Sequence, residues 1–143
     1  MTEEKKTVMS LELAEREFNS WAENMGIEVS DEIRGENDEI VFSNGKKLFC
    51  RAMTKGNAAV NTDGNLVYTI SSRSPEGYKG TDVEITLPPP RAFVSGGKND
   101  SGGMQRVLSV ASGMTGKDTG WLMNLALPDF KFFMGIAGLF LID

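Results

Sequence analysis

Apolar side chains recur at steps of three and four residues near the start of the chain, between Ser10 and Met25. At 3.6 residues per turn this spacing gathers them on one face of a helix and leaves the charged side chains on the others. Ser10 is a suitable N-cap and Gly26 a suitable stop. The pattern therefore predicts a helix from about Ser10 to Met25 whose buried face contains Leu11, Ala14, Phe18, Trp21, Ala22 and Met25.

The next patterned segment, "NDEIVFSNGKKLFCRAMTKG", fits two structures. Asn37 can cap a helix that ends at Gly56, with a cationic last turn. The first half also fits two short strands joined by an Asn44-Gly45 turn. We favour the helix because its cationic end and glycine stop agree with each other. Its expected buried side holds Val41, Leu48, Phe49, Ala52 and Met53.

The middle of the chain changes to an alternating pattern. Asp63-Gly64 separates two apolar runs, and Leu66, Tyr68 and Ile70 alternate with Val67 and Thr69, which is typical of a hairpin. The stretch "DVEITL" alternates again, so a third antiparallel strand is expected. Three consecutive prolines, Pro88 to Pro90, then prevent the strand from continuing.

Helical spacing returns after the prolines. Met104, Val107, Leu108, Ala111 and Met114 share one face, and Asp118 or Thr119 can cap a short helix after it. Pro128-Asp129 can begin another helix, because proline is tolerated in a first turn. From Phe132 to Ile142 no side chain is charged or forms hydrogen bonds. A helix that is apolar on all sides must be buried, either in its own core or against another protein.

These elements predict an α+β fold with N-terminal helices, a small antiparallel sheet in the middle and a C-terminal helical segment. The length suits one domain with one sizeable core. The expected divisions of this single domain, 1–143, are a flexible N-terminus (1–9), a helix plus small sheet (10–87), a Pro/Gly linker (88–103) and C-terminal helices (104–143).

The composition and charge of the chain limit the classes of partner that we expect. The chain has 15 basic and 20 acidic residues, a net charge of −5, and no cationic run longer than a pair, which argues against nucleic acid. The first residues lack the apolar stretch of a signal peptide, and there is one cysteine, so we expect an intracellular protein. The apolar C-terminal stretch is about half the roughly 20 residues that a membrane span needs, so no membrane association is expected.

Candidate chemistry is sparse. There is no histidine and only Cys50 as a thiol, which removes the usual nucleophile activation and the usual zinc sites. The glycine-rich stretches 95–103 and 112–120 do not match a phosphate-binding loop and are predicted to be flexible connections. The acidic run from Glu28 to Glu39 lacks the calcium-loop pattern and is predicted to be a solvated loop and helix start. We therefore expect no catalysis, no cofactor and no metal; catalysis by carboxylates alone stays open, without a marked pair.

The last third of the chain carries a recognisable order of features. An apolar helix is followed by Thr-Gly, polar residues, two leucines three apart, an aspartate and an apolar terminal helix. This order resembles the tail assembly chaperones of long-tailed phages, small proteins made beside the tape measure protein. The apolar strand before the three prolines is also similar to the family, in which a short apolar strand followed by proline begins this pattern. The matching positions are 104–114, Thr115-Gly116, Leu122, Leu125, Asp129 and 130–142.

The resemblance implies a function in tail assembly in the host cytoplasm. Its expected partner is the tape measure protein, a long hydrophobic helical chain, with tail tube subunits as a second candidate and self-association into a homo-oligomer. Flexible Met, with Phe and Leu, suits binding to varied helices. The expected partner-binding residues are Leu122, Leu125, Phe130, Phe133, Met134, Leu139 and Phe140.

Three alternatives stay open at this point. The same terminal side chains can fill the protein's own core instead of binding a partner. The protein can be a structural component that remains in the phage tail, in tail completion or along the tube. It can also be a small enzyme or a bacterial regulatory domain that the sequence does not mark.

Overall fold

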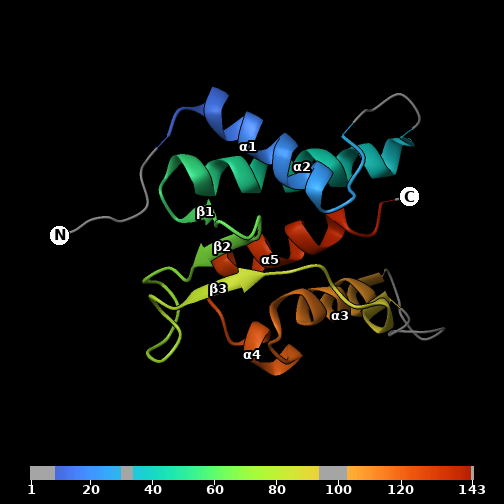
Figure 1. Ribbon diagram of the computed structural model, residues 1–143. Helices are drawn as coiled ribbons and strands as arrows, with labels where there is room; N and C mark the ends of the chain where they lie inside the picture. Colours follow the sequence, from blue (N-terminus) through green and yellow to red (C-terminus); the bar gives the residue numbers. More distant parts are fainter. Residues whose placement is uncertain (1–8, 30–33, 94–102, 143) are drawn as a thin grey trace.

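The structure, a computed structural model, describes residues 9–29, 34–93 and 103–142 of the chain. In chain order it contains helices α1 and α2, strands β1 to β3, a short 3-10 helix η1, and helices α3 to α5. Figure 1 shows α5 in the middle, with α1 and α2 on one side and α3 and α4 on the other. The predicted α+β class, with a small antiparallel sheet between helical segments, is confirmed.

Helix α1 spans Leu11–Asn24 and begins and ends as its sequence predicts. The Ser10 hydroxyl accepts a hydrogen bond from the backbone N–H of Leu13 over 3.2 Å, and Gly26 after the helix has a φ of 79°. Phe18 and Trp21 lie in the core. Leu11 was also expected there, but it is 60% exposed and lines a surface hollow instead.

Helix α2 spans Glu36–Thr54, so the helix interpretation is confirmed over the strand alternative. Gly45 is not a turn residue: it lies inside α2, where a Cβ would be 2.6 Å from Cγ of Leu139. Three acidic side chains occupy the first turn, where the helix dipole favours them. Phe49, Ala52 and Met53 are buried as expected, whereas Val41 is 37% exposed and its neighbour Phe42 takes the buried position.

The sheet is a three-stranded antiparallel meander in the order β1-β2-β3. The strands are β1 Ala58–Val60, β2 Leu66–Thr69 and β3 Asp82–Ile85. The expected alternation holds, since Leu66, Tyr68 and Ile70 are buried while Val67 and Thr69 are half-buried. One face of the sheet therefore contributes to the core.

The prolines lead into η1, Pro90–Phe93, which packs against α3, Met104–Thr115. Ala92 of η1 is buried, and its carbonyl accepts a hydrogen bond from the Ser109 hydroxyl over 2.8 Å. This part of the predicted linker thus lies against the helices. Residues 94–102 of the linker, most of the first glycine-rich stretch and residues 1–8 lie outside the described residues.

The second glycine-rich stretch, 112–120, is mostly helical. It contains the end of α3, the left-handed Gly116 with a φ of 73°, and the start of α4, Thr119–Met123. The predicted cap is confirmed, since the Asp118 carboxylate accepts a hydrogen bond from the N–H of Trp121 over 2.8 Å. The expected flexible connection is therefore a short turn fixed by hydrogen bonds between two helices.

Helix α5, Leu127–Leu139, is the central helix of the core. It packs against both α2 and α3, and one hydrophobic core cluster includes buried residues from α1 to α5. The apolar C-terminal stretch is therefore buried largely in the protein's own core. Across the described residues, no helix combines the length and the apolar character that a membrane span requires.

Candidate functional site

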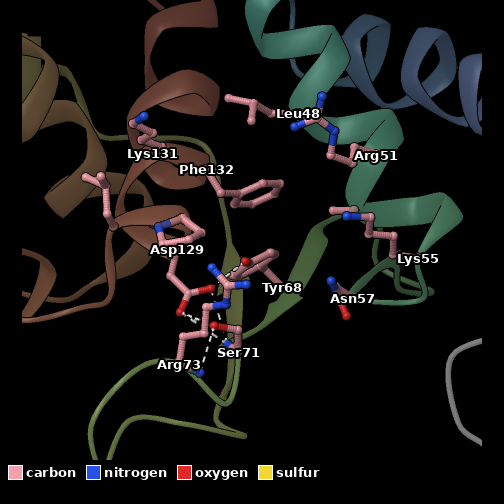
Figure 2. A pocket seen from close by; sticks show the side chains of 13 residues that line it. Leu48, Arg51, Lys55, Asn57, Tyr68, Ser71, Arg73, Asp129, Lys131 and Phe132 are labelled. Carbon is pink, nitrogen blue, oxygen red and sulfur yellow. Dashed lines mark hydrogen bonds between the residues drawn. The ribbon is translucent and has the colours of Figure 1, made fainter.

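Asp129, in the first turn of α5, is the one charged side chain that the described structure buries completely, with 0% exposure. Its carboxylate accepts hydrogen bonds from the hydroxyls of Tyr68, Ser71 and Ser74 over 2.6, 2.8 and 2.6 Å. The backbone N–H of Ser71 also donates to both carboxylate oxygens, over 3.2 and 3.3 Å (Figure 2). Every donor is neutral, and together they satisfy the buried carboxylate.

This network joins α5 to the end of β2 and to the loop that follows it. Ser74 does so twice, because its hydroxyl donates to Asp129 and also accepts from the N–H of Ala126, the N-cap residue of α5. An aspartate in the first turn is favoured by the helix dipole as well. Asp129 therefore positions α5 on the sheet. Its oxygens are already occupied by these donors, so it is not a free general base.

Tyr68 is held by the same network. Burial raises the pKa of its hydroxyl above the ordinary value, and the hydrogen bond to Asp129 and the negative charge of Asp129 raise it further. The tyrosine ring also stacks on Phe132 of α5, with ring centroids 4.0 Å apart and planes 14° apart. Tyr68 is therefore neutral near pH 7 and serves as a donor and a packing group.

A hollow of ≈ 450 Å³ lies over these two rings, and we call it the basic groove. Arg51 comes from α2, Lys55 is the C-cap residue of α2, Arg73 lies in the loop after β2, and Lys131 comes from α5. Figure 2 shows these side chains around the rings of Phe132 and Tyr68. All four are exposed, and none has an ion-pair partner among the described residues.

A second hollow, the terminal groove, lies at the C-terminal end of α5 and measures ≈ 270 Å³. Side chains that follow α1 and β3 form its other walls. The lining is mostly apolar and consists of Met25, Gly26, Ile27, Glu28, Leu87, Pro88, Phe93, Leu139, Phe140 and Ile142.

The residues predicted to bind a partner fall into two groups. Leu122, Leu125, Phe133 and Leu139 are at most 8% exposed, so they do not form an open surface in this conformation. Phe130, Met134 and Phe140 are half-buried against the core. The seven residues therefore do not share one exposed surface: α5 packs against α2 and α3, its first turns line the basic groove, and its C-terminal end lines the terminal groove.

The sequence interpretation missed Tyr68, Ser71 and Ser74 as partners of Asp129. One signal was present, since a single aspartate stands between Pro128 and the apolar run of α5. A carboxylate in such a place needs buried donors. The hydroxyl-rich stretch "SSRS" offers them, but nothing local links it to α5.

The described residues contain no candidate metal site, and their one thiol is buried. No group of three or more Cys, Asp or Glu side chains there is placed to hold a metal ion. Cys50 is buried, and burial raises the pKa of its thiol, which lowers its reactivity.

Comparison with known proteins adds no relative: no family model, no curated protein and no solved structure matches the chain.

Proposed function

We propose that this protein is a phage tail assembly chaperone that binds the hydrophobic helical tape measure protein and catalyses no reaction. Two things support the proposal. One is the resemblance in the last third of the sequence. The other, which carries it structurally, is the terminal groove, an apolar hollow that contains Leu139 and Phe140 of the predicted binding residues.

The groove combines a rigid floor with accessible walls. Leu139 is 1% exposed and packs against Gly45 of α2, which fixes the end of α5. Phe140 is half-buried, and its ring meets that of Trp21 edge-on at 6.0 Å. Leu87 on the wall is 57% exposed. An apolar helix in this groove would bury Leu87, which is favourable by about 25 cal/mol per Å² of apolar surface removed from water.

The terminal groove carries little charge, which favours an apolar partner. Glu28 is the single charged residue in the lining, and the other side chains offer no hydrogen-bonding group. A long apolar helix needs cover of this kind before a tail tube encloses it. In this account the leucines and Phe133 of the family-like pattern build the fold that presents the groove, and only the end of α5 touches the client.

The wider parts of the proposal follow from the same groove. Tail tube subunits are a second candidate partner. A homo-oligomer formed through the terminal groove is the expected state of the free protein, because an exposed apolar hollow favours self-association. The site of action is then the host cytoplasm, where tails are assembled.

Co-expression with the tape measure protein encoded by the same phage tests the proposal. We expect soluble tape measure protein that co-purifies with this chain. Leu87→Asp with Ile142→Asp should abolish the complex, because both changes place charge in the groove. The matched control is Met123→Asp on α4, whose side chain is 64% exposed and outside the groove lining.

Thermal unfolding of each variant shows whether its fold is retained. A tape measure protein that aggregates regardless of this chain would contradict the proposed function. Equal loss of binding in Met123→Asp and in the groove variant would contradict the terminal groove as the binding surface.

A further inference from the structure

The basic groove is separate from the terminal groove and has a different chemistry. It adjoins another hollow along α2, and the two share Arg51. Together they are lined by six of the chain's 15 basic residues: Lys46, Lys47, Arg51, Lys55, Arg73 and Lys131. The acidic side chains in the two linings are Glu15 and the fully buried Asp129. Although the chain has a net charge of −5, the linings of these two hollows thus carry more basic than acidic side chains.

We propose that the basic groove binds an acidic peptide segment of a protein partner, one that carries apolar side chains among its carboxylates. This inference does not rest on the tape measure proposal. It rests on cations without ion-pair partners in the described structure, set around a hollow with an apolar floor.

The apolar part of the groove argues for a peptide over a small anion. Leu127 at the rim is 61% exposed, Pro128 beside it is exposed, and Leu48 of α2 is half-buried in the same lining. These side chains offer contacts to leucine or phenylalanine side chains that phosphate cannot use. An acidic residue next to an apolar one matches both features of the groove.

The first turn of α5 also argues against a phosphate site. Helix N-termini bind phosphate through free backbone N–H groups and the helix dipole. Here the N–H of Ala126 already donates to Ser74, and the negative charge of Asp129 lies in the first turn. A second anion at this helix end would meet repulsion rather than free donors.

Nucleic acid fits the groove less well. Single strands bind where bases can stack on exposed aromatic rings along a cationic track. The rings at the floor, Tyr68 and Phe132, stack on each other and are 5% and 3% exposed. They leave no free face for a base.

The distribution of the cations suggests how the segment is held. Arg51 is in the last turn of α2, and Lys55, four residues later, is its C-cap. Lys131 is on α5, and Arg73 is on the loop between β2 and β3. Carboxylates spaced along an extended peptide can meet cations from several elements in turn. Such exposed pairs are individually weak and are screened by salt, so the binding should depend strongly on ionic strength.

Fluorescence anisotropy tests the proposal with a labelled peptide of about eight residues, roughly 26 Å when extended, made of glutamate with leucine at every third position. We expect saturable binding that weakens with added salt. Matched probes replace the glutamates with lysine or the leucines with serine, and both should bind more weakly. Inorganic phosphate is the small-anion competitor.

Lys55→Ala with Lys131→Ala should weaken peptide binding about tenfold, because two exposed charge contacts are lost. The control is Arg91→Ala with Lys117→Ala, which removes the same charge from the surface beside η1 and α3. Binding to the control should stay within about twofold of the parent protein. Three results would overturn the proposal. The first is equal weakening of peptide binding in both double variants. The others are displacement of the labelled peptide by phosphate at a lower concentration than unlabelled peptide requires, and binding of single-stranded nucleic acid that is tighter than binding of the peptide.

Discussion

Tyr68 and Asp129 are 61 residues apart in the chain, yet the tyrosine hydroxyl donates a hydrogen bond of 2.6 Å to Oδ1 of the aspartate. Ser71 and Ser74 complete the set of hydroxyl donors. This contact fixes the helix that carries the terminal groove onto the sheet. The stability of the fold should therefore depend on Asp129 more than on any exposed carboxylate.

Replacing Asp129 tests this dependence. Asp129→Ala leaves the donors from β2 and its loop without an acceptor, so we expect a loss of about 3–4 kcal/mol in the free energy of unfolding. Asp129→Asn keeps one acceptor oxygen and should cost about 1–2 kcal/mol. Urea unfolding followed by circular dichroism measures both. Stability within about 0.5 kcal/mol of the parent for Asp129→Ala would show that the network does not hold α5 in place.

The raised pKa of Tyr68 predicts a loss of stability at alkaline pH. The unfolded chain begins to release the tyrosine proton near pH 10, the ordinary pKa, whereas the folded protein still holds it. The stabilisation is therefore complete below about pH 10 and decreases above it, at about 1.4 kcal/mol per pH unit for one group.

Tyr68→Phe isolates this effect. The variant should be less stable than the parent near pH 7, because Asp129 loses a donor, and the difference should shrink as the pH rises above about 10. Burial also raises the pKa of Cys50 from 9.0, but that thiol is present in both proteins and cancels in the comparison. A difference in unfolding free energy that stays constant from pH 9 to 11 would contradict the assigned environment of Tyr68.

Close packing between α2 and α5 yields a further prediction. A Cβ on Gly45 would lie within 2.6 to 2.9 Å of three side-chain carbons of Leu139, a residue that is 1% exposed and has little room to move. Gly45→Ala should therefore destabilise the protein by about 2 kcal/mol, even though alanine favours helices.

The control is Gly120→Ala in α4. A Cβ there would meet one atom of Asp118 at an ordinary 3.6 Å, so the change should be neutral or stabilising by up to about 1 kcal/mol. Thermal unfolding of the two variants measures the contrast. If both had the same melting temperature, the close approach of α2 and α5 would be wrong.

Local signals account for much of the fold. Ser10 and Gly26 mark the ends of α1, Asp118 caps α4, and the alternation around Tyr68 predicts the buried face of β2, because each of these features acts within a few residues. The cationic end and the glycine stop of α2 likewise favoured the helix over two strands at Gly45. The close packing of Gly45 against Leu139 could not be predicted, because the two residues are far apart in the chain.

The candidate site was less accessible to sequence reasoning. The apolar stretch of α5 is compatible with a core or an interface, and its place between α2 and α3 puts Phe133 and Leu139 in the core. The donors of Asp129 and the cations of the basic groove come from separate elements. Their meeting depends on tertiary packing, which no local pattern encodes.

Hydrogen exchange on the complex with the co-expressed tape measure protein tests the central claim most directly. The account predicts slower exchange in the complex at backbone amides of the terminal groove, at 25–28 and 139–142, with the amides of α4 unchanged. Unchanged exchange at these groove amides, or protection confined to other surfaces, would contradict the claim that the end of α5 binds the tape measure helix.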